Sequence, residues 1–233
     1  MPRITKVDRV CSPDEAITLQ DKGVSFIGVS MTKDIRFKDS RRVSLEEAVA
    51  IRDVLRDGVS FSVELPIAYL NGSENNPIAS LDFDYIQVDA HELTYIDYME
   101  HYQSLGDSKL VLSGIDVSYD SDPSWILSGV AQEFMRSGTI FQIDILPEIS
   151  NSWEFLKTEC PKFSEDLQLA DLDYLASQFQ ILFTTDFSQE NLSELSILIP
   201  NNFGIYLVLG EHSVREDVHF FSYSEVLRIL DAL

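Results

Sequence analysis

Short apolar runs alternate along this chain with segments of helical period, and this alternation constrains the fold more than any other feature. The runs that read as strands occupy residues 4–10, 25–31, 59–66, 85–90, 109–117, 139–146, 179–185 and 203–209. Repeated units of this kind predict a parallel α/β sheet, either closed into a (β/α)8 TIM barrel or left open as a doubly wound sheet. Eight units in 233 residues favour the TIM barrel.

Capping residues mark two of the helices between these strands. Ser12 and Pro13 predict a helix start, and Gly23 predicts its end. Ser44 and Glu47 have the spacing of a capping box. The helical patterns cover residues 12–23, 44–58, 93–107, 123–138, 188–198 and 222–233, and a further helix over 152–163 is interrupted by Pro161.

Composition narrows the class of protein. With 45% hydrophobic residues and no linker or low-complexity block, the chain predicts one TIM-barrel domain over residues 1–233. The net charge of −22 argues against a binder of nucleic-acid backbones, which needs clustered Lys and Arg. A small-molecule substrate is the expected partner: the acidic balance suits a cationic one, and Tyr206 either fills the barrel or stacks on an aromatic one.

Two cysteines, Cys11 and Cys160, form neither a disulfide framework nor a metal-binding spacing. No apolar run approaches the ~18 residues that a membrane helix needs. These features predict a cytoplasmic protein outside the membrane, and they imply no cofactor. The sequence does not specify an oligomeric state.

Acidic residues follow most of the predicted strands, at the end of a TIM barrel where chemistry takes place. They are Asp8, Glu64, Asp89, Asp116, Asp144, Asp186 and Glu211. Some carboxylates in such positions only cap helices. Asp8, Asp89 and Asp144 differ because each interrupts a strand pattern among apolar or small neighbours. They are candidates for a proton shuttle, a metal ligand or a counterion to a cation.

The order of motifs resembles phosphoribosylanthranilate isomerase, a (β/α)8 enzyme of tryptophan biosynthesis. The family's Lys-Ile-Cys-Gly strand is matched by residues 6–9, and its first helix by "CSPDEA" over 11–16. Its second strand is matched by "KGVSFIGVS", and its Ser-x-Arg-Tyr-Val-Ser-x-Glu-x-Ala by "DSRRVSLEEA". The resemblance is strong through residue 58 and thin afterwards. It implies that Arg41 contacts substrate.

The same resemblance places two catalytic carboxyl groups. The family's base is a cysteine, and Asp8 stands at its position; the family's general-acid aspartate corresponds to Asp144. The related isomerase of histidine biosynthesis runs the same Amadori rearrangement with a pair of aspartates. Asp8 and Asp144 are therefore the expected acid–base pair.

The family's phosphate-binding turns are altered here. It holds a 5-phosphate with glycine-rich turns after strands six, seven and eight, whose N–H groups point at the anion. In this chain the turn after strand seven reads Thr185-Asp186, and after strand eight only Gly210 remains. The expected substrate therefore lacks the terminal phosphate. Besides Arg41, the residues expected to contact it are Asp89, Asp116, Asp186, Tyr206 and Gly210.

Two other functions remain open. The barrel is a non-catalytic binding or scaffold protein if aromatic side chains, namely Phe37, Trp125, Trp153 and Tyr206, crowd its mouth. A metal-dependent lyase or hydrolase would use the ligands Asp89, His91, Asp116, Asp144 and His212. No His-x-His pair or similar spacing supports a metal site, so we expect none.

Overall fold

The computed structural model describes residues 4–32, 41–65, 81–90, 109–120, 138–210 and 219–233. Its strands are β1 (Ile4–Asp8), β2 (Phe26–Ser30), β3 (Ser60–Glu64), β4 (Tyr85–Asp89), β5 (Lys109–Val117), β6 (Ile140–Ile145), β7 (Gln180–Thr184), β8 (Gly204–Leu209) and β9 (Phe220–Phe221). Its helices are α1 (Pro13–Asp21), α2 (Leu45–Asp53), α5 (Ser152–Thr158), α6 (Leu169–Gln178), α7 (Leu192–Leu198) and α8 (Tyr223–Leu230), with a 3₁₀ turn at Cys160–Lys162.

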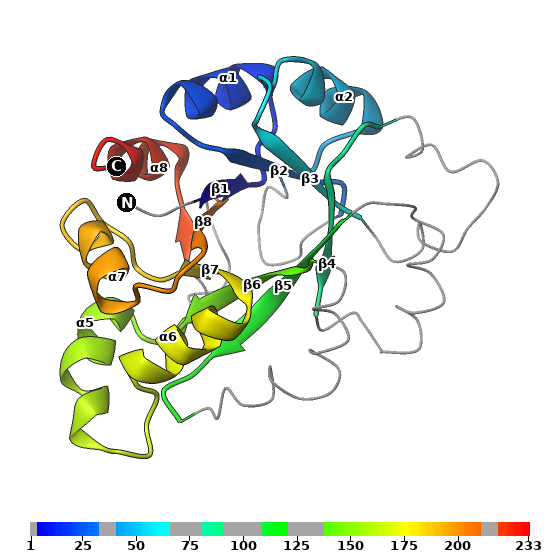
Figure 1. Cartoon of the computed structure of the whole chain (residues 1–233). Coiled ribbons are helices and arrows are strands. Elements are labelled where there is room, and N and C mark those ends of the chain that lie inside the picture. Colours follow the sequence, from blue (N-terminus) through cyan, green and yellow to red (C-terminus); the bar gives the residue numbers. More distant parts are fainter. Residues whose placement is uncertain (1–3, 33–40, 66–80, 91–108, 121–137, 211–218) are drawn as a thin grey trace.

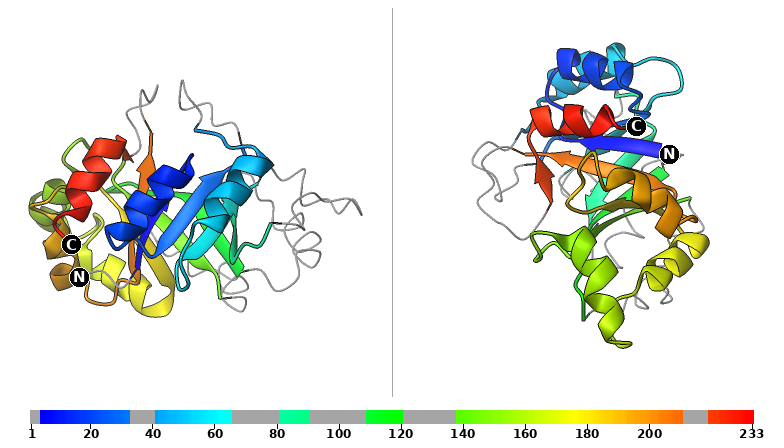
Figure 2. Two further views of the ribbon diagram at one scale, coloured as in Figure 1. Left: turned by 90° about the horizontal axis from the view of Figure 1, so that it is seen from above. Right: turned by 90° about the vertical axis from the view of Figure 1, so that its left-hand side faces the viewer.

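Strands β1 to β8 pair in parallel and in sequence order, and β8 returns to pair with β1 (Figure 1). That last pairing runs in register from Ile4↔Gly204 to Asp8↔Val208. The sheet is therefore a closed (β/α)8 barrel, as predicted, and the open doubly wound alternative is excluded. The described helices lie outside the ring of strands (Figure 2).

Strand alternation divides the buried side chains into two layers. Outward-facing strand residues pack against the helices in the larger hydrophobic cluster. A smaller cluster inside the barrel contains Phe26, Val111, Ile140, Leu182 and Tyr206. Above this apolar floor, the inward positions toward the C-terminal ends of the strands carry polar side chains instead of the branched aliphatic residues common in TIM barrels.

The two capped helices form as predicted. Ser12 accepts a hydrogen bond from the Glu15 backbone N–H at 3.2 Å. Ser44 and Glu47 make the reciprocal contacts of a capping box. Helix α2 ends at Asp53, earlier than the predicted residue 58.

Other boundaries differ from the sequence prediction. β1 ends at Asp8 and not at residue 10, because Arg9 takes a left-handed backbone conformation with φ of 65°. The helix before Pro161 stops at Thr158. Helix α6 and the two-residue strand β9 were not predicted, and the predicted helices over 93–107 and 123–138 lie outside the described residues.

Candidate active site at the barrel mouth

A cavity opens at the C-terminal ends of the strands, where the predicted acidic residues converge. Its lining includes the carboxylates of Asp8, Glu64, Asp89, Asp116 and Asp144. The structure therefore brings together five of the seven acids that follow strands in the sequence. Glu211 lies outside the described residues, and Asp186 faces elsewhere, as shown below.

Asp8 is buried and hydrogen-bonded through both carboxylate oxygens. Oδ1 forms an ion pair with the Lys6 ammonium, and Oδ2 accepts from Gln142 Nε2 at 2.6 Å. A side chain at Gly28 could not coexist with this arrangement, because its Cβ would lie 1.9 Å from Asp8 Oδ1. The glycine on β2 thus makes room for the carboxylate on β1.

Lys6 lies inside the barrel beneath the cavity and is fully buried. Its ammonium donates to Gln87 Oε1 at 2.7 Å and lies 5.1 Å from the centroid of the Phe26 ring. Burial lowers the pKa of Lys6, against the opposing attraction of Asp8. In the sequence Lys6 stands out only as part of a motif. It precedes Asp8 by two residues, and this spacing on a strand places both side chains on the inward face.

Asp144 is buried at the end of β6 and is held by His219. The His219 backbone N–H donates to Oδ2 at 3.1 Å, and the imidazole Nδ1 lies 2.5 Å from Oδ1. The imidazole Nε2 lies 3.0 Å from the hydroxyl of Ser152, which donates to Asp186 Oδ1 at 2.8 Å. His219 was missed from the sequence because nothing near it in the chain shows that this residue lies beside Asp144 of β6.

The two predicted catalytic acids therefore face one cavity. Gln142, which contacts Asp8, lies two residues before Asp144 on β6 and on the same inward face. One amide side chain thus spans the interval between the exits of β1 and β6.

Three of the residues predicted to bind substrate also line the cavity. Asp89 packs over the bulge in β5, where Gly114 has a φ of 74° and a Cβ would lie 2.5 Å from Asp89 Oδ1. Asp116 pairs in register with Asp144. Tyr206 reaches the cavity from the apolar floor and is 7% exposed, so it belongs to barrel packing as well.

Arg41, the predicted substrate contact, lies outside the lining of the cavity. Its Nη2 contacts both carboxylate oxygens of Glu15 at 2.6 Å, and its Nε donates to the Arg9 carbonyl at 2.8 Å. The residue that brings a guanidinium to the mouth is Arg9, whose Nη2 lies 3.7 Å from Glu64 Oε2. Arg41 supports the backbone turn that places Arg9 there.

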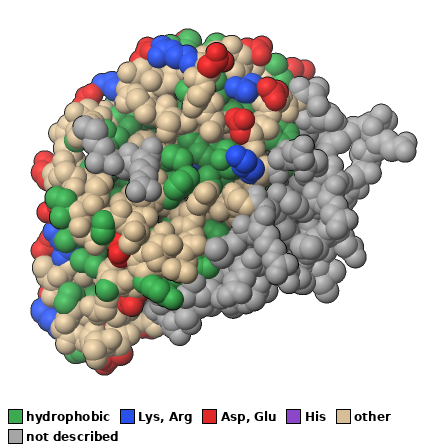
Figure 3. All heavy atoms as spheres, in the orientation of Figure 1, with side chains coloured by type: hydrophobic (Ala, Val, Ile, Leu, Met, Phe, Trp, Pro, Cys, Tyr) green, Lys and Arg blue, Asp and Glu red, His purple; other side chains and the backbone are tan. Residues whose placement is uncertain are grey.

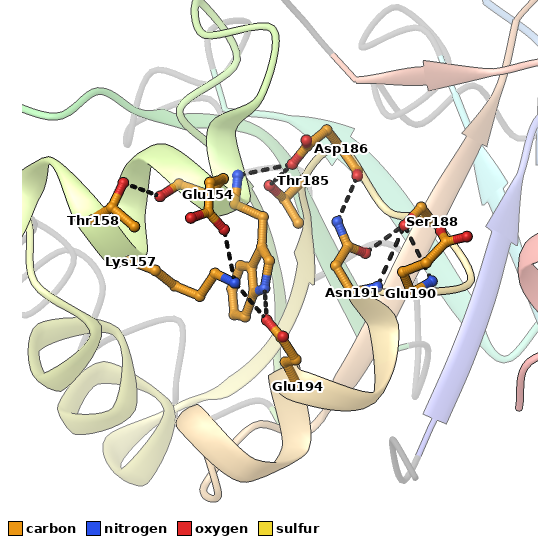
Figure 4. Close-up of polar contacts among 10 residues, drawn as sticks. Glu154, Lys157, Thr158, Thr185, Asp186, Ser188, Glu190, Asn191 and Glu194 are labelled. Atoms are coloured by element: carbon orange, nitrogen blue, oxygen red, sulfur yellow. Dashed lines mark hydrogen bonds and ion pairs between the residues drawn. The ribbon is translucent and has the colours of Figure 1, made fainter.

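Asp186 turns away from the barrel axis and caps helix α5 (Figure 4). Its Oδ1 accepts from the Trp153 backbone N–H at 2.8 Å, and its carbonyl accepts from Asn191 Nδ2 at 2.9 Å. Gly210, the other predicted contact at this edge, donates its N–H to the Phe221 carbonyl at 3.0 Å. Strand β9 thereby uses the amide of the one glycine that the turn retains.

Cys11 lies three residues beyond Asp8. Burial raises its pKa to about 11, and its Sγ lies 3.4 Å from Glu15 Oε2. A thiol in this setting stays protonated near neutral pH.

Two other predictions concern metals and aromatic residues. Within the described ranges, no group of three or more His, Cys, Asp or Glu residues could hold a metal ion, and His91 and His212 lie outside those ranges. Trp153 is 2% exposed and its indole donates to Glu194 Oε2 at 2.8 Å, so it anchors α5 on α7. Phe37 and Trp125 lie outside the described residues.

The exterior gives two further observations. On the face shown in Figure 3, Lys and Arg side chains of the described surface are separated from one another and form no broad basic patch. Among the helices of the described ranges, none has the length and apolar character needed to cross a membrane.

Known structures similar to this chain share its fold. No family model and no curated protein matches the sequence. Phosphoribosylanthranilate isomerase from Thermotoga maritima is 12% identical, with a TM-score of 0.63 and coverage of 99% of both chains. The isomerase from Thermus thermophilus is 14% identical, with a TM-score of 0.61, over 98% of this chain and 97% of its own.

A second kind of barrel is similar at the same level. The phospho-2-dehydro-3-deoxyheptonate aldolase of Thermotoga maritima is 14% identical with a TM-score of 0.61, over 98% of this chain and 66% of its own. At these identities the likeness concerns the fold alone. The chain is thus a (β/α)8 barrel similar in architecture to these enzymes.

Proposed function

We propose that the protein is a divergent isomerase-like barrel enzyme whose acid–base chemistry uses Asp8 and Asp144 on a substrate that lacks a terminal phosphate. The reaction is an aldose–ketose rearrangement of the Amadori type or a related proton transfer. Arg9 replaces Arg41 as the guanidinium expected at the substrate.

One observation carries the proposal. The turns after β6, β7 and β8 would have to offer free N–H groups to a phosphate. Here the Trp153 N–H is taken by Asp186, the Gly210 N–H by Phe221, and the Phe187 N–H by Thr185 at 2.7 Å. The chain's own carboxylate occupies the position at the start of α5 that an anion would need.

Charge adds to the loss of donors. A phosphate about 5 Å from Asp186 would be repelled by about 3 kcal/mol per unit charge at an effective dielectric near 20. That energy corresponds to a loss of affinity of roughly a hundredfold. We therefore expect little or no turnover of N-(5-phosphoribosyl)anthranilate.

The mouth has the parts that an aldose–ketose isomerisation requires. A proton delivered to the ring oxygen lets the bond between that oxygen and C1 break, and removal of the C2 proton gives an enol; the enol then gains a proton at C1 and loses its hydroxyl proton to give the ketone. In this proposal Asp144, hydrogen-bonded to His219, would deliver the first proton. Asp8, paired with the Lys6 ammonium, is the carboxylate that would carry the second.

A non-catalytic binding or scaffold protein is the second candidate, and one observation favours it. Both oxygens of Asp8 already accept from protein donors, as in a carboxylate whose role is structural. A base in that state must exchange one of these contacts for substrate. The two functions therefore differ in whether Asp8 transfers a proton.

Solvent hydrogen exchange separates the two candidates. The full chain would be incubated in D₂O with unphosphorylated aldoses and aldosylamines, and NMR would follow deuterium at C1 of the ketose product and at C2 of the recovered aldose. The enzyme function predicts incorporation that Asp8→Asn and Asp144→Asn each abolish, with thermal unfolding showing that both variants fold. Incorporation at the wild-type rate in both variants would refute the acid–base pair. No incorporation over the series would leave the binding function.

A further inference from the structure

The barrel mouth has an excess of hydrogen-bond acceptors and of negative charge. Of the lining residues that the structure describes, five carry carboxylates and one, Arg9, carries a guanidinium. Within this described part of the lining, acids therefore outnumber cations. A cavity walled by low-dielectric protein focuses such a charge onto whatever it binds.

An independent observation points to a ligand that donates hydrogen bonds. Gln142 is fully buried and lines the cavity, and within the described part of the chain its Oε1 accepts no hydrogen bond. The amide cannot reverse without loss, because its Nε2 donates to Asp8 Oδ2. Asp8 therefore fixes the orientation in which the unpaired oxygen remains an acceptor.

Two buried hydroxyl groups on other strands, those of Ser62 on β3 and Thr184 on β7, also lack a partner in the described ranges, but neither residue lines the cavity. Buried polar atoms without partners are uncommon in native proteins and carry a cost. Among the described residues, Gln142 is the one that combines an unpaired buried oxygen with a place in the cavity lining, so it indicates a site that a hydrogen-bond donor completes.

We propose that the barrel mouth is a binding site for a small organic cation with a primary ammonium group, which donates to Gln142 Oε1 and is balanced by Asp144 and Asp89. An ammonium group supplies three hydrogen-bond donors for the unpaired oxygen and a positive charge opposite the carboxylates. This inference rests on the proposed function for the identity of the site, and it names the substrate class: an amino-substituted polyol or sugar.

Calorimetric titration tests the inference with defined probes. D-Glucosamine and ethanolamine at pH 6, where their amines are protonated, would be compared with their neutral counterparts D-glucose and ethylene glycol. Each cation should bind at least about tenfold more tightly than its neutral counterpart, and added salt should reduce the difference. Equal affinity within each pair, or binding of none of the four, would overturn the inference.

Variants locate the binding. Asp89→Asn should weaken D-glucosamine binding about tenfold, whereas Glu165→Gln removes the same charge at an exposed position away from the mouth and should leave it unchanged. Gln142→Met should weaken binding threefold or more, with its fold checked by thermal unfolding; if it does not fold, the comparison of Asp89→Asn with Glu165→Gln decides. Equal effects of these two charge variants would mean a general acidic field and no built site.

The outcome is separable from that of the proposed function. Cation binding without C2 hydrogen exchange would refute the acid–base enzyme and leave the cation site. Hydrogen exchange on neutral aldoses, with no preference for the ammonium compounds in binding, would refute the cation site and leave the acid–base enzyme.

Discussion

The exits of β1 and β6 carry the same residue type in different settings. Asp8 is paired with the buried Lys6 ammonium and the Gln142 amide. Asp144 contacts His219, and a chain of hydrogen bonds leads from His219 through Ser152 to Asp186. The contacts of Asp8 hold an ion pair inside the barrel, and the contacts of Asp144 connect the mouth to the start of α5. The difference shows that an aspartate's role in such a barrel is decided by its partners, of which Gln142 and His219 come from distant parts of the chain.

The largest expected effect follows from removing the ion pair between Lys6 and Asp8 on β1. Lys6→Met leaves the Asp8 carboxylate buried without its cation, and we expect a loss of about 3–5 kcal/mol in the free energy of unfolding. The double variant Lys6→Met/Asp8→Asn should recover most of this loss, because the uncompensated charge is gone. Urea unfolding measures both; a loss below about 1 kcal/mol in the single variant would show that the ion pair is not what the fold depends on.

The second prediction concerns the thiol beside the β1 exit. With a pKa of about 11 from burial, Cys11 should react with a thiol-specific disulfide reagent at pH 8 about two orders of magnitude more slowly than a free cysteine. Cys160→Ser provides the background on which to measure it. A rate near that of free cysteine would mean that the β1 exit offers a thiolate as well as Asp8.

A third prediction breaks the chain of contacts at β6. His219→Ala removes the partner of Asp144 and of the Ser152 hydroxyl, and we expect a loss of about 1–3 kcal/mol in unfolding free energy. Ser152→Ala, which keeps the contact between His219 and Asp144, should cost less. A greater loss from Ser152→Ala would mean that the hydroxyl, and not the imidazole, organises this exit.

The smallest expected effect concerns Glu194, which joins α7 to α5 through hydrogen bonds from Trp153 and Lys157. Hydrogen bonds from Lys157 and Trp153 hold the pKa of Glu194 below its ordinary value of 4.5, on a side chain that is 40% exposed. Its stabilisation is therefore present above pH 4.5 and is lost as the pH falls through the lower, folded-state pKa. Glu194→Gln should cost at most about 1 kcal/mol at pH 7 and less at pH 3. A cost that does not change with pH would contradict this contribution.

Strand periodicity and capping residues were sufficient to predict the barrel, because each depends on residues close together in sequence. The acids at Asp8, Asp89, Asp116 and Asp144 were found for the same reason: each ends a recognisable strand. The partners of these acids were not found. Lys6 lies two residues before Asp8 on the same face of β1, whereas Gln142 and His219 contact the acids from distant parts of the chain, and no local pattern encodes those two contacts.

The same limit explains Arg41 and Asp186. Both were placed in the site by a motif match, yet Arg41 is engaged by Glu15 and Asp186 by the start of α5. A motif fixes a position along a strand or loop, but the direction of a long side chain depends on which neighbour offers the better partner. Arg9 took the place at the mouth because its left-handed backbone turns it there.

The most direct test of the account is a crystal structure of the full chain soaked in concentrated sulfate. The account predicts no sulfate at the turns after β6, β7 and β8, with Asp186 still accepting from the Trp153 N–H and Phe221 from the Gly210 N–H. A sulfate hydrogen-bonded to either amide, with the Asp186 carboxylate turned aside, would show that the anion site persists and would contradict the proposed substrate class.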